Sequence, residues 1–121
     1  MVGVGCVLVF LLATMLREAP PGVTVAEPPP GAVGRWVSAD PRYRDRGLRV
    51  GARDVALELG PDQPLLRGDI VLVSVREEDH LPVVYIEYDT GEGPMVLEMI
   101  LDGNDRMHLR NPSDVVWTRV R

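Results

Sequence analysis

An alternation of apolar and polar residues recurs along most of this chain, and it constrains the fold more than any other feature. Residues 83–89 place Val84, Ile86 and Tyr88 on one face, and residues 95–101 repeat the pattern. Successive side chains of a β-strand point to opposite faces, so this period of two predicts strands that are buried on one side. The expected strands are residues 36–37, 48–50, 55–59, 69–76, 83–89, 95–101, 107–109 and 115–120.

Turn-forming residues separate these expected strands. The breaks fall at residues 60–64, 79–82, 90–94 and 102–105, which are rich in glycine, proline, asparagine and aspartate. The Asp102–Gly103 pair favours a hairpin, because glycine accepts the positive φ that such a turn needs. A long meander leaves two open edges unless it closes. We therefore expect residues 33–121 to form an all-β domain, an antiparallel meander of seven to eight strands that closes into a small barrel.

The first 18 residues form a separate apolar segment. Residues 2–16 carry no charge, and Arg17 and Glu18 end the run. A helix of this length reaches about 22 Å, less than the roughly 30 Å hydrocarbon core of a bilayer. We expect residues 1–18 to be a signal peptide or a signal anchor that meets the membrane, with cleavage or retention left open. The alternative is a buried helix of the domain, which the proline-rich residues that follow disfavour.

Residues 19–32 are expected to form a linker. Five of these fourteen residues are proline, which disfavours helix and sheet alike. An extended, polyproline-like spacer is the prediction. A proline-rich ligand for a partner domain is the alternative, although no basic anchor flanks the run.

The charges follow a basic–acidic–basic order along the folded part. All 13 basic residues are arginines, and the formal net charge is -5. Residues 35–53 carry a net charge of +4, residues 54–105 carry -11 and residues 106–121 carry +3. Such an acidic chain is a poor candidate for binding nucleic acid. We expect the basic end strands to lie beside the acidic middle strands and neutralise them.

Arginines in residues 40–47 form the candidate binding site. Arg42, Arg44 and Arg46 occupy alternate positions, so an extended chain would point them the same way, close to Tyr43. Guanidinium groups bind phosphates and carboxylates through paired hydrogen bonds. We predict that these four residues contact an anionic ligand or an envelope protein. Ion pairing with the acidic strands is the alternative.

Residues suited to catalysis are sparse. The single cysteine, Cys6, lies in the apolar run, and neither His80 nor His108 accompanies a recognisable nucleophile and acid. The segment 102–105 lacks the ligand spacing of a calcium loop, and we interpret it as a turn. We therefore expect no catalytic residues, no metal and no cofactor.

Residues 33–36 read Val-Gly-Arg-Trp, which resembles the Gly-x-Trp motif at the first strand of lipocalins and related calycin barrels. The resemblance implies that Trp36 plugs one end of the barrel. It also implies that an arginine near the last strand, Arg119 or Arg121, packs across it beside Trp117. Trp36, Trp117 and Arg119 are accordingly the candidate barrel plug.

The same resemblance extends to the strand pattern of the whole domain. Residues 36–45 and the closing segment 111–117 look like small uncharacterised lipocalin-like domains of bacterial envelope proteins. Residues 36–121 number only 86, however, and eight short strands enclose little more than their own side chains. A large ligand cavity of the lipocalin kind is therefore not expected.

These observations favour a non-catalytic, lipocalin-like module that is tethered to the membrane or secreted, with its β-domain outside the cytoplasm. In this hypothesis the barrel binds a small ligand or an envelope partner. The alternative is a structural or assembly module of a membrane complex that takes no small molecule. An enzyme is the least favoured hypothesis.

Overall fold

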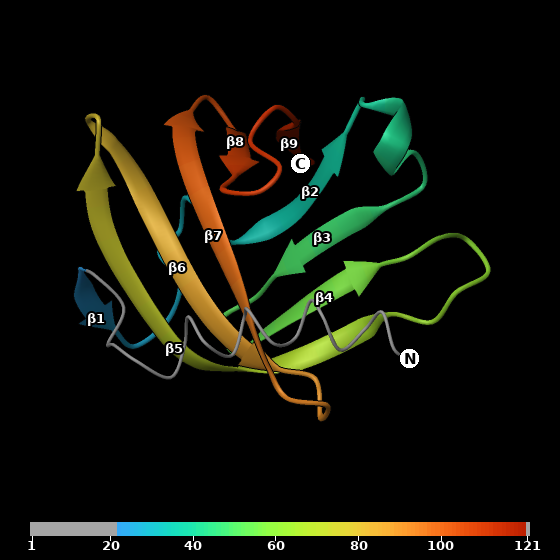
Figure 1. Ribbon diagram of the computed structural model, residues 1–121, viewed down its shortest axis with the longest axis horizontal. Helices are drawn as coiled ribbons and strands as arrows, with labels where there is room; N and C mark the ends of the chain where they lie inside the picture. Colours follow the sequence, from blue (N-terminus) through green and yellow to red (C-terminus); the bar gives the residue numbers. More distant parts are fainter. Residues whose placement is uncertain (1–21, 121) are drawn as a thin grey trace.

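The computed structural model describes residues 22–120, which form strands and one short helical turn (Figure 1). The strands are β1 (Val23–Val25), β2 (Gly34–Ser38), β3 (Gly47–Val50), β4 (Asp54–Glu58), β5 (Leu66–Glu78), β6 (Leu81–Asp89), β7 (Pro94–Gly103), β8 (Arg106–Leu109) and β9 (Val116–Val120). A 3₁₀ turn, η1 (Pro41–Tyr43), follows β2. The described part is all-β, as the alternation predicts.

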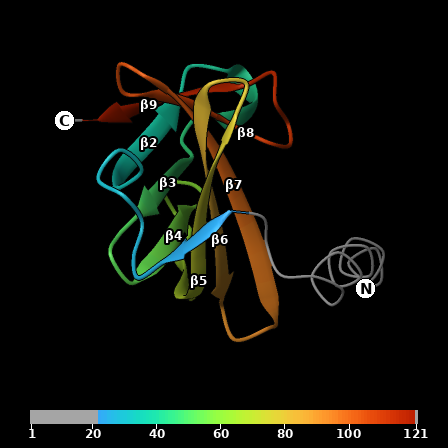
Figure 2. The same cartoon turned by 90° about the vertical axis from the view of Figure 1, so that its left-hand side faces the viewer.

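Strands β2 to β9 form a closed antiparallel barrel (Figures 1 and 2). Each strand pairs with the next one along the chain, and β9 pairs back with β2. In this closing pair Trp36 lies directly opposite Arg119. The predicted meander barrel of seven to eight strands is therefore confirmed, with eight strands, and closure removes the open edges that such a meander would otherwise leave.

The sheet forks along β5, the longest strand. Residues 66–69 of β5 pair with β4, and residues 73–75 pair with β1 along the same edge. Strand β6 lies along the other edge. An irregular register between Ile70 and Leu72 lies at the fork, where an extra residue bends a strand. Strand β1 therefore extends the sheet beyond the barrel wall.

The position of β1 corrects one expectation. Residues 23–25 lie inside the proline-rich segment, where we expected no sheet, yet they pair with Val73, Ser74 and Val75. The prolines of this segment flank these three residues in sequence and do not interrupt them. The composition of the segment therefore hid a short strand.

The expected signal segment, residues 1–18, lies outside the described residues. Within residues 22–120, no helix is long and apolar enough to cross a membrane. The domain boundaries drawn from the sequence stay predictions.

The alternating apolar residues line the barrel interior. Val84, Ile86 and Met99 are completely buried, and Trp36 and Trp117 are only 1% and 5% exposed. The faces predicted for β6 and β7 are therefore confirmed. The buried core comprises Ala32, Trp36, Leu48, Val50, Val55, Val73, Val84, Ile86, Tyr88, Leu97, Met99, Met107, Val115 and Trp117.

Two hairpins are made by pairs of residues with positive φ. Asp79 and His80 join β5 to β6, with φ of 51° and 68°. Asn104 and Asp105 join β7 to β8, with φ of 54° and 59°. The sequence predicts Gly103 within the second turn. It has a positive φ of 83°, but it ends β7 at an irregular register, so the turn centre falls on the two residues after it.

A glycine in β5 makes room for a buried tyrosine of β6. A Cβ atom on Gly68 would lie 2.7 Å from Cδ2 of Tyr88 and 3.0 Å from the carbonyl oxygen of Asp89. Tyr88 is only 4% exposed, and burial raises the pKa of its hydroxyl. The ring of Tyr88 thus lies directly against the backbone of the neighbouring strand.

Replacing this glycine should weaken the barrel. We expect Gly68→Ala to lower the free energy of unfolding by about 1–3 kcal/mol, because the added methyl group must displace a packed ring. Gly31→Ala is the control, since a Cβ atom there would meet only Cδ1 of Leu101 at an ordinary 3.5 Å. Urea unfolding of both variants checks this, and equal stability of the two would contradict the packing argument.

Candidate functional site

At one place in the barrel wall, Arg119 lies over the indole ring of Trp36. The guanidinium carbon is 5.4 Å from the ring centroid, within the range of a cation–π contact. The indole Nε1 donates a hydrogen bond to the carbonyl oxygen of Ala32 at 3.0 Å. The resemblance implied this contact for Arg119 or Arg121. The structure places Arg119 there, and Arg121 lies outside the described residues.

Arg119 also ties the chain before β2 to the barrel. Its Nη1 donates to the carbonyl oxygens of Pro30 and Val33, at 2.8 and 2.9 Å. Its Nε and Nη2 donate to Oδ1 of Asp105, at 3.0 and 2.6 Å. A Cβ atom on Gly34 would lie 2.8 Å from Cδ of Arg119. The glycine of the Gly-x-Trp pattern therefore leaves space for the arginine stem.

A second aromatic contact joins η1 to the barrel. Tyr43 packs on Trp117, with the ring centroids 5.3 Å apart and the planes tilted by 57°. The Nε1 of Trp117 is buried and meets no acceptor within the described part of the chain. Tyr43, predicted as a ligand contact, and Trp117, predicted as part of the plug, are therefore neighbours.

The expectation that Arg42, Arg44 and Arg46 point the same way is wrong. The three residues of η1 lie between Asp40 and Arg44, and this helical turn breaks the period of two that an extended chain would have. Arg42 is ion-paired, Arg44 is exposed and lines none of the grooves described below, and Arg46 lines a groove. The three arginines thus have three different environments.

Arg42 stabilises η1 itself. Oδ1 of Asp40 caps the turn by accepting a hydrogen bond from the backbone N–H of Arg42 at 2.9 Å. The Arg42 guanidinium pairs with Asp40 at 2.9 Å and with Asp114 at 3.0 Å. Its hydrogen bonds to Asp40 lower the pKa of that carboxyl to about 2. Arg42 is therefore ion-paired, but with Asp40 and Asp114 and not with the acidic middle strands that the alternative named.

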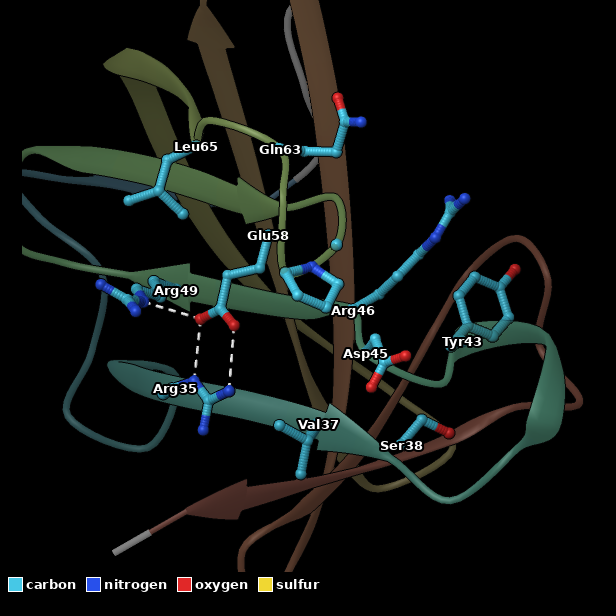
Figure 3. Close-up of a pocket in the computed structure, with 12 residues that line it drawn as sticks. Arg35, Val37, Ser38, Tyr43, Asp45, Arg46, Arg49, Glu58, Gln63 and Leu65 are labelled. Atoms are coloured by element: carbon cyan, nitrogen blue, oxygen red, sulfur yellow. Dashed lines mark hydrogen bonds and ion pairs between the residues drawn. The ribbon is translucent and has the colours of Figure 1, made fainter.

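Arg46 borders a polar groove of about 460 Å³ on the outside of the barrel (Figure 3). Tyr43 lines the groove from the end of η1 and Asp45 from the loop after it, and Gln63 and Leu65 line it from the loop between β4 and β5. Arg46 is exposed and forms no ion pair within residues 22–120. The groove therefore has one unneutralised guanidinium at its rim.

The floor of the groove is an ion-pair cluster centred on Glu58. Its carboxylate accepts hydrogen bonds from Nε and Nη2 of Arg35, at 2.8 and 2.9 Å, and from Nε of Arg49, at 2.7 Å (Figure 3). A Cβ atom on Gly47 would lie only 2.8 Å from Oε1 of Glu58, so a side chain at this position would displace the carboxylate. The hydrogen bonds, those from Arg35 above all, lower the pKa of Glu58 to about 2. An ionised carboxylate thus holds two arginines side by side.

This pKa has a consequence for stability at low pH. Glu58 has an ordinary pKa of 4.5 when unfolded and about 2 when folded, so its contribution is complete above pH 4.5 and is lost as the pH falls towards 2. We expect Glu58→Gln to lower the stability at pH 7 by at most about 1 kcal/mol, because the arginines are half exposed. The variant should also lose less stability than the parent protein between pH 4.5 and 2.

Urea unfolding across this pH range measures both effects. Glu77→Gln is the matched control, since Glu77 is exposed and has no ion pair in the described structure. An acid dependence that is identical in the parent and in Glu58→Gln would show that the cluster contributes nothing to folding.

Other ion pairs confirm the expected neutralisation of the acidic middle strands. Arg110, from the basic end of the chain, pairs with Glu78 at 2.8 Å and with Glu98 at 3.5 Å. Arg35 pairs with Glu58 from the other basic segment. Most arginines of the described residues are therefore ion-paired, and Arg46 differs from them because it is not.

The histidines and the acidic turns form no recognisable metal site. His80 is exposed in the β5–β6 hairpin, and His108 is partly buried on β8. The segment 102–105 contains the β7–β8 hairpin, as interpreted from the sequence. Among residues 22–120, no group of three or more histidine, cysteine, aspartate or glutamate side chains is placed to hold a metal ion.

Sequence reasoning did not bring Arg35, Arg49 and Glu58 together. The alternation places each of them on the outer face, but only the register of β2, β3 and β4 shows which outer residues are neighbours. Gly47 was the available signal, because a glycine inside a strand marks a place where another group approaches the backbone closely.

Comparison with known proteins finds no match to this chain among family models, curated proteins or solved structures. The closed eight-stranded barrel is established by its own strand pairing. The resemblance to lipocalins, which rests on the Gly-x-Trp pattern and the strand order, stays a prediction.

Proposed function

We propose that the barrel is a non-catalytic binding module that takes a carboxylate or phosphate group in the groove beside Arg46. The observation that carries this proposal is the cluster in which Glu58 holds Arg35 and Arg49 next to the unpaired Arg46. Together with Asp45, the groove has three guanidinium groups and two carboxylates. The groove is therefore positively charged on a protein that is acidic as a whole.

The cluster also offers hydrogen-bond donors that are already in place. A guanidinium has five N–H donors, and the bonds to Glu58 use Nε and Nη2 of Arg35 and only Nε of Arg49. The two side chains are 44% and 52% exposed, so the remaining donors are accessible. Because Glu58 restrains both side chains, less conformational entropy is lost when an anion binds.

Removing the charge of Arg46 tests this proposal. We expect Arg46→Ala to weaken the binding of citrate, a probe with three carboxylates, by about tenfold, as expected for one lost charge-assisted hydrogen bond. Isothermal titration calorimetry on the full chain at pH 7 and low salt measures this. Thermal unfolding should be unchanged, because Arg46 forms no ion pair within the described residues.

Arg53→Ala is the matched control for this experiment. Arg53 is also exposed and has no ion pair in the described structure, and it lies in the β3–β4 turn outside the groove. Equal weakening by both variants would mean that citrate responds only to net charge, and the groove would no longer be the binding site.

We also propose that the barrel acts outside the cytoplasm. The first 18 residues either anchor it to the membrane or are cleaved, which releases it. The uncharged run of residues 2–16 supports this part of the proposal. Fusing the whole chain to a reporter enzyme that is active only outside the cytoplasm should give activity that is lost when residues 1–18 are deleted. Equal activity of the two fusions would refute the location.

A further inference from the structure

The groove beside Arg46 continues into a second groove on the same outer face. The second groove, of about 360 Å³, shares Arg35, Arg49 and Leu65 with the first. Arg67 and Ala56 line it on the side away from Arg46. The two grooves therefore meet at the arginine pair that Glu58 holds.

The strand register explains why the arginines form a row. Arg35 on β2 lies directly opposite Arg49 on β3, which lies opposite Ala56 on β4, which lies opposite Arg67 on β5. Neighbouring strands are about 4.8 Å apart, so the row is roughly 14 Å long. Like charges directly opposite each other destabilise a sheet. Arg35 and Arg49 form such a pair, and Glu58 compensates for their repulsion. The row of three arginines across four strands matches the length of an extended anion.

Two of the carboxylates beside this row are already occupied by arginines. Glu58 bonds to Arg35 and Arg49, and Asp54 bonds to Arg67. Arg67 is 65% exposed, so its other N–H donors are accessible from solvent. The arginines of the row thus present N–H donors to solvent, while the carboxylates of Glu58 and Asp54 are engaged in ion pairs.

Aliphatic side chains accompany the arginines. Leu65, which lines both grooves, is 42% exposed, and Val37 also lines the first groove. Sugar rings usually stack on exposed aromatic rings, but the aromatic side chain of the first groove, Tyr43, is packed on Trp117. A half-exposed leucine instead offers apolar surface against which an aliphatic side chain of a peptide can pack.

We infer that the two grooves together bind an extended acidic peptide segment of a partner protein. This inference rests on the proposed anion-binding function. An extended peptide advances about 3.4 Å per residue, so four or five residues span the row. Carboxylates of the segment bind the arginines of each groove, and an aliphatic side chain between them packs on Leu65.

Calorimetric titration of the full chain with acetyl-Glu-Glu-Leu-Glu-Glu-amide tests this inference. We expect Arg67→Ala to weaken peptide binding by about fivefold to tenfold, as for one lost charged contact, and to leave citrate binding unchanged. The control is Arg106→Ala, because Arg106 is similarly exposed and ion-paired, with Asp102, but lies outside both grooves. Replacing the leucine of the peptide by serine should weaken binding about threefold or more.

The outcomes separate this inference from the proposal on which it rests. If Arg67→Ala binds the peptide as the parent does while Arg46→Ala still weakens citrate, the second groove is not part of the site and only the anion-binding function stands. If polygalacturonate binds more tightly than the peptide, and does so through Arg67, the peptide assignment is overturned in favour of an acidic polysaccharide. If neither citrate nor the peptide binds, both proposals fail.

Discussion

Pairing of the last strand with the first is the constraint on which the rest of this structure depends. The closing register places Trp36 opposite Arg119, so a charged side chain enters the wall where the barrel closes. A guanidinium that is only 21% exposed needs partners, and Arg119 finds them in Asp105, two backbone carbonyls and the indole ring. These contacts bring the chain before β2, strand β9 and the β7–β8 hairpin to one point. Closure therefore rests on a polar anchor as much as on apolar packing.

The register that closes the barrel also determines its outer face. Leu48 and Val50 are buried, so Arg49 between them must point outwards, where it meets Arg35. Two arginines directly opposite each other repel, and Glu58 reaches across Gly47 to compensate for that repulsion. The basic groove is thus a consequence of inward packing combined with the choice of arginine at successive outer positions. A polar residue without charge would satisfy the same strand pattern, so burial alone does not require arginine at these positions.

How far the sequence predicts this structure depends on the range of the interaction. Alternation is local, so it predicted the eight strands of the barrel and the buried faces of β6 and β7. The partners of Glu58 come from the two preceding strands, and only the register shows that their side chains meet. The prediction from residue spacing was also wrong around Arg42. Asp40 caps a helical turn there, where we had assumed an extended chain. Strand β1 was hidden because the prolines beside it dominate the composition of that segment.

The two buried tryptophans show how stability and binding are distributed over the barrel. The Nε1 of Trp36 has an acceptor and its ring faces a cation, whereas the Nε1 of Trp117 is buried without an acceptor in the described structure. Trp117 instead packs its ring against Tyr43, at a centroid distance of 5.3 Å. Tyr43 also lines the basic groove. One side chain thus belongs to both the packed aromatic pair and the basic groove, so a change of the Tyr43 ring position would alter the core contact and the groove together.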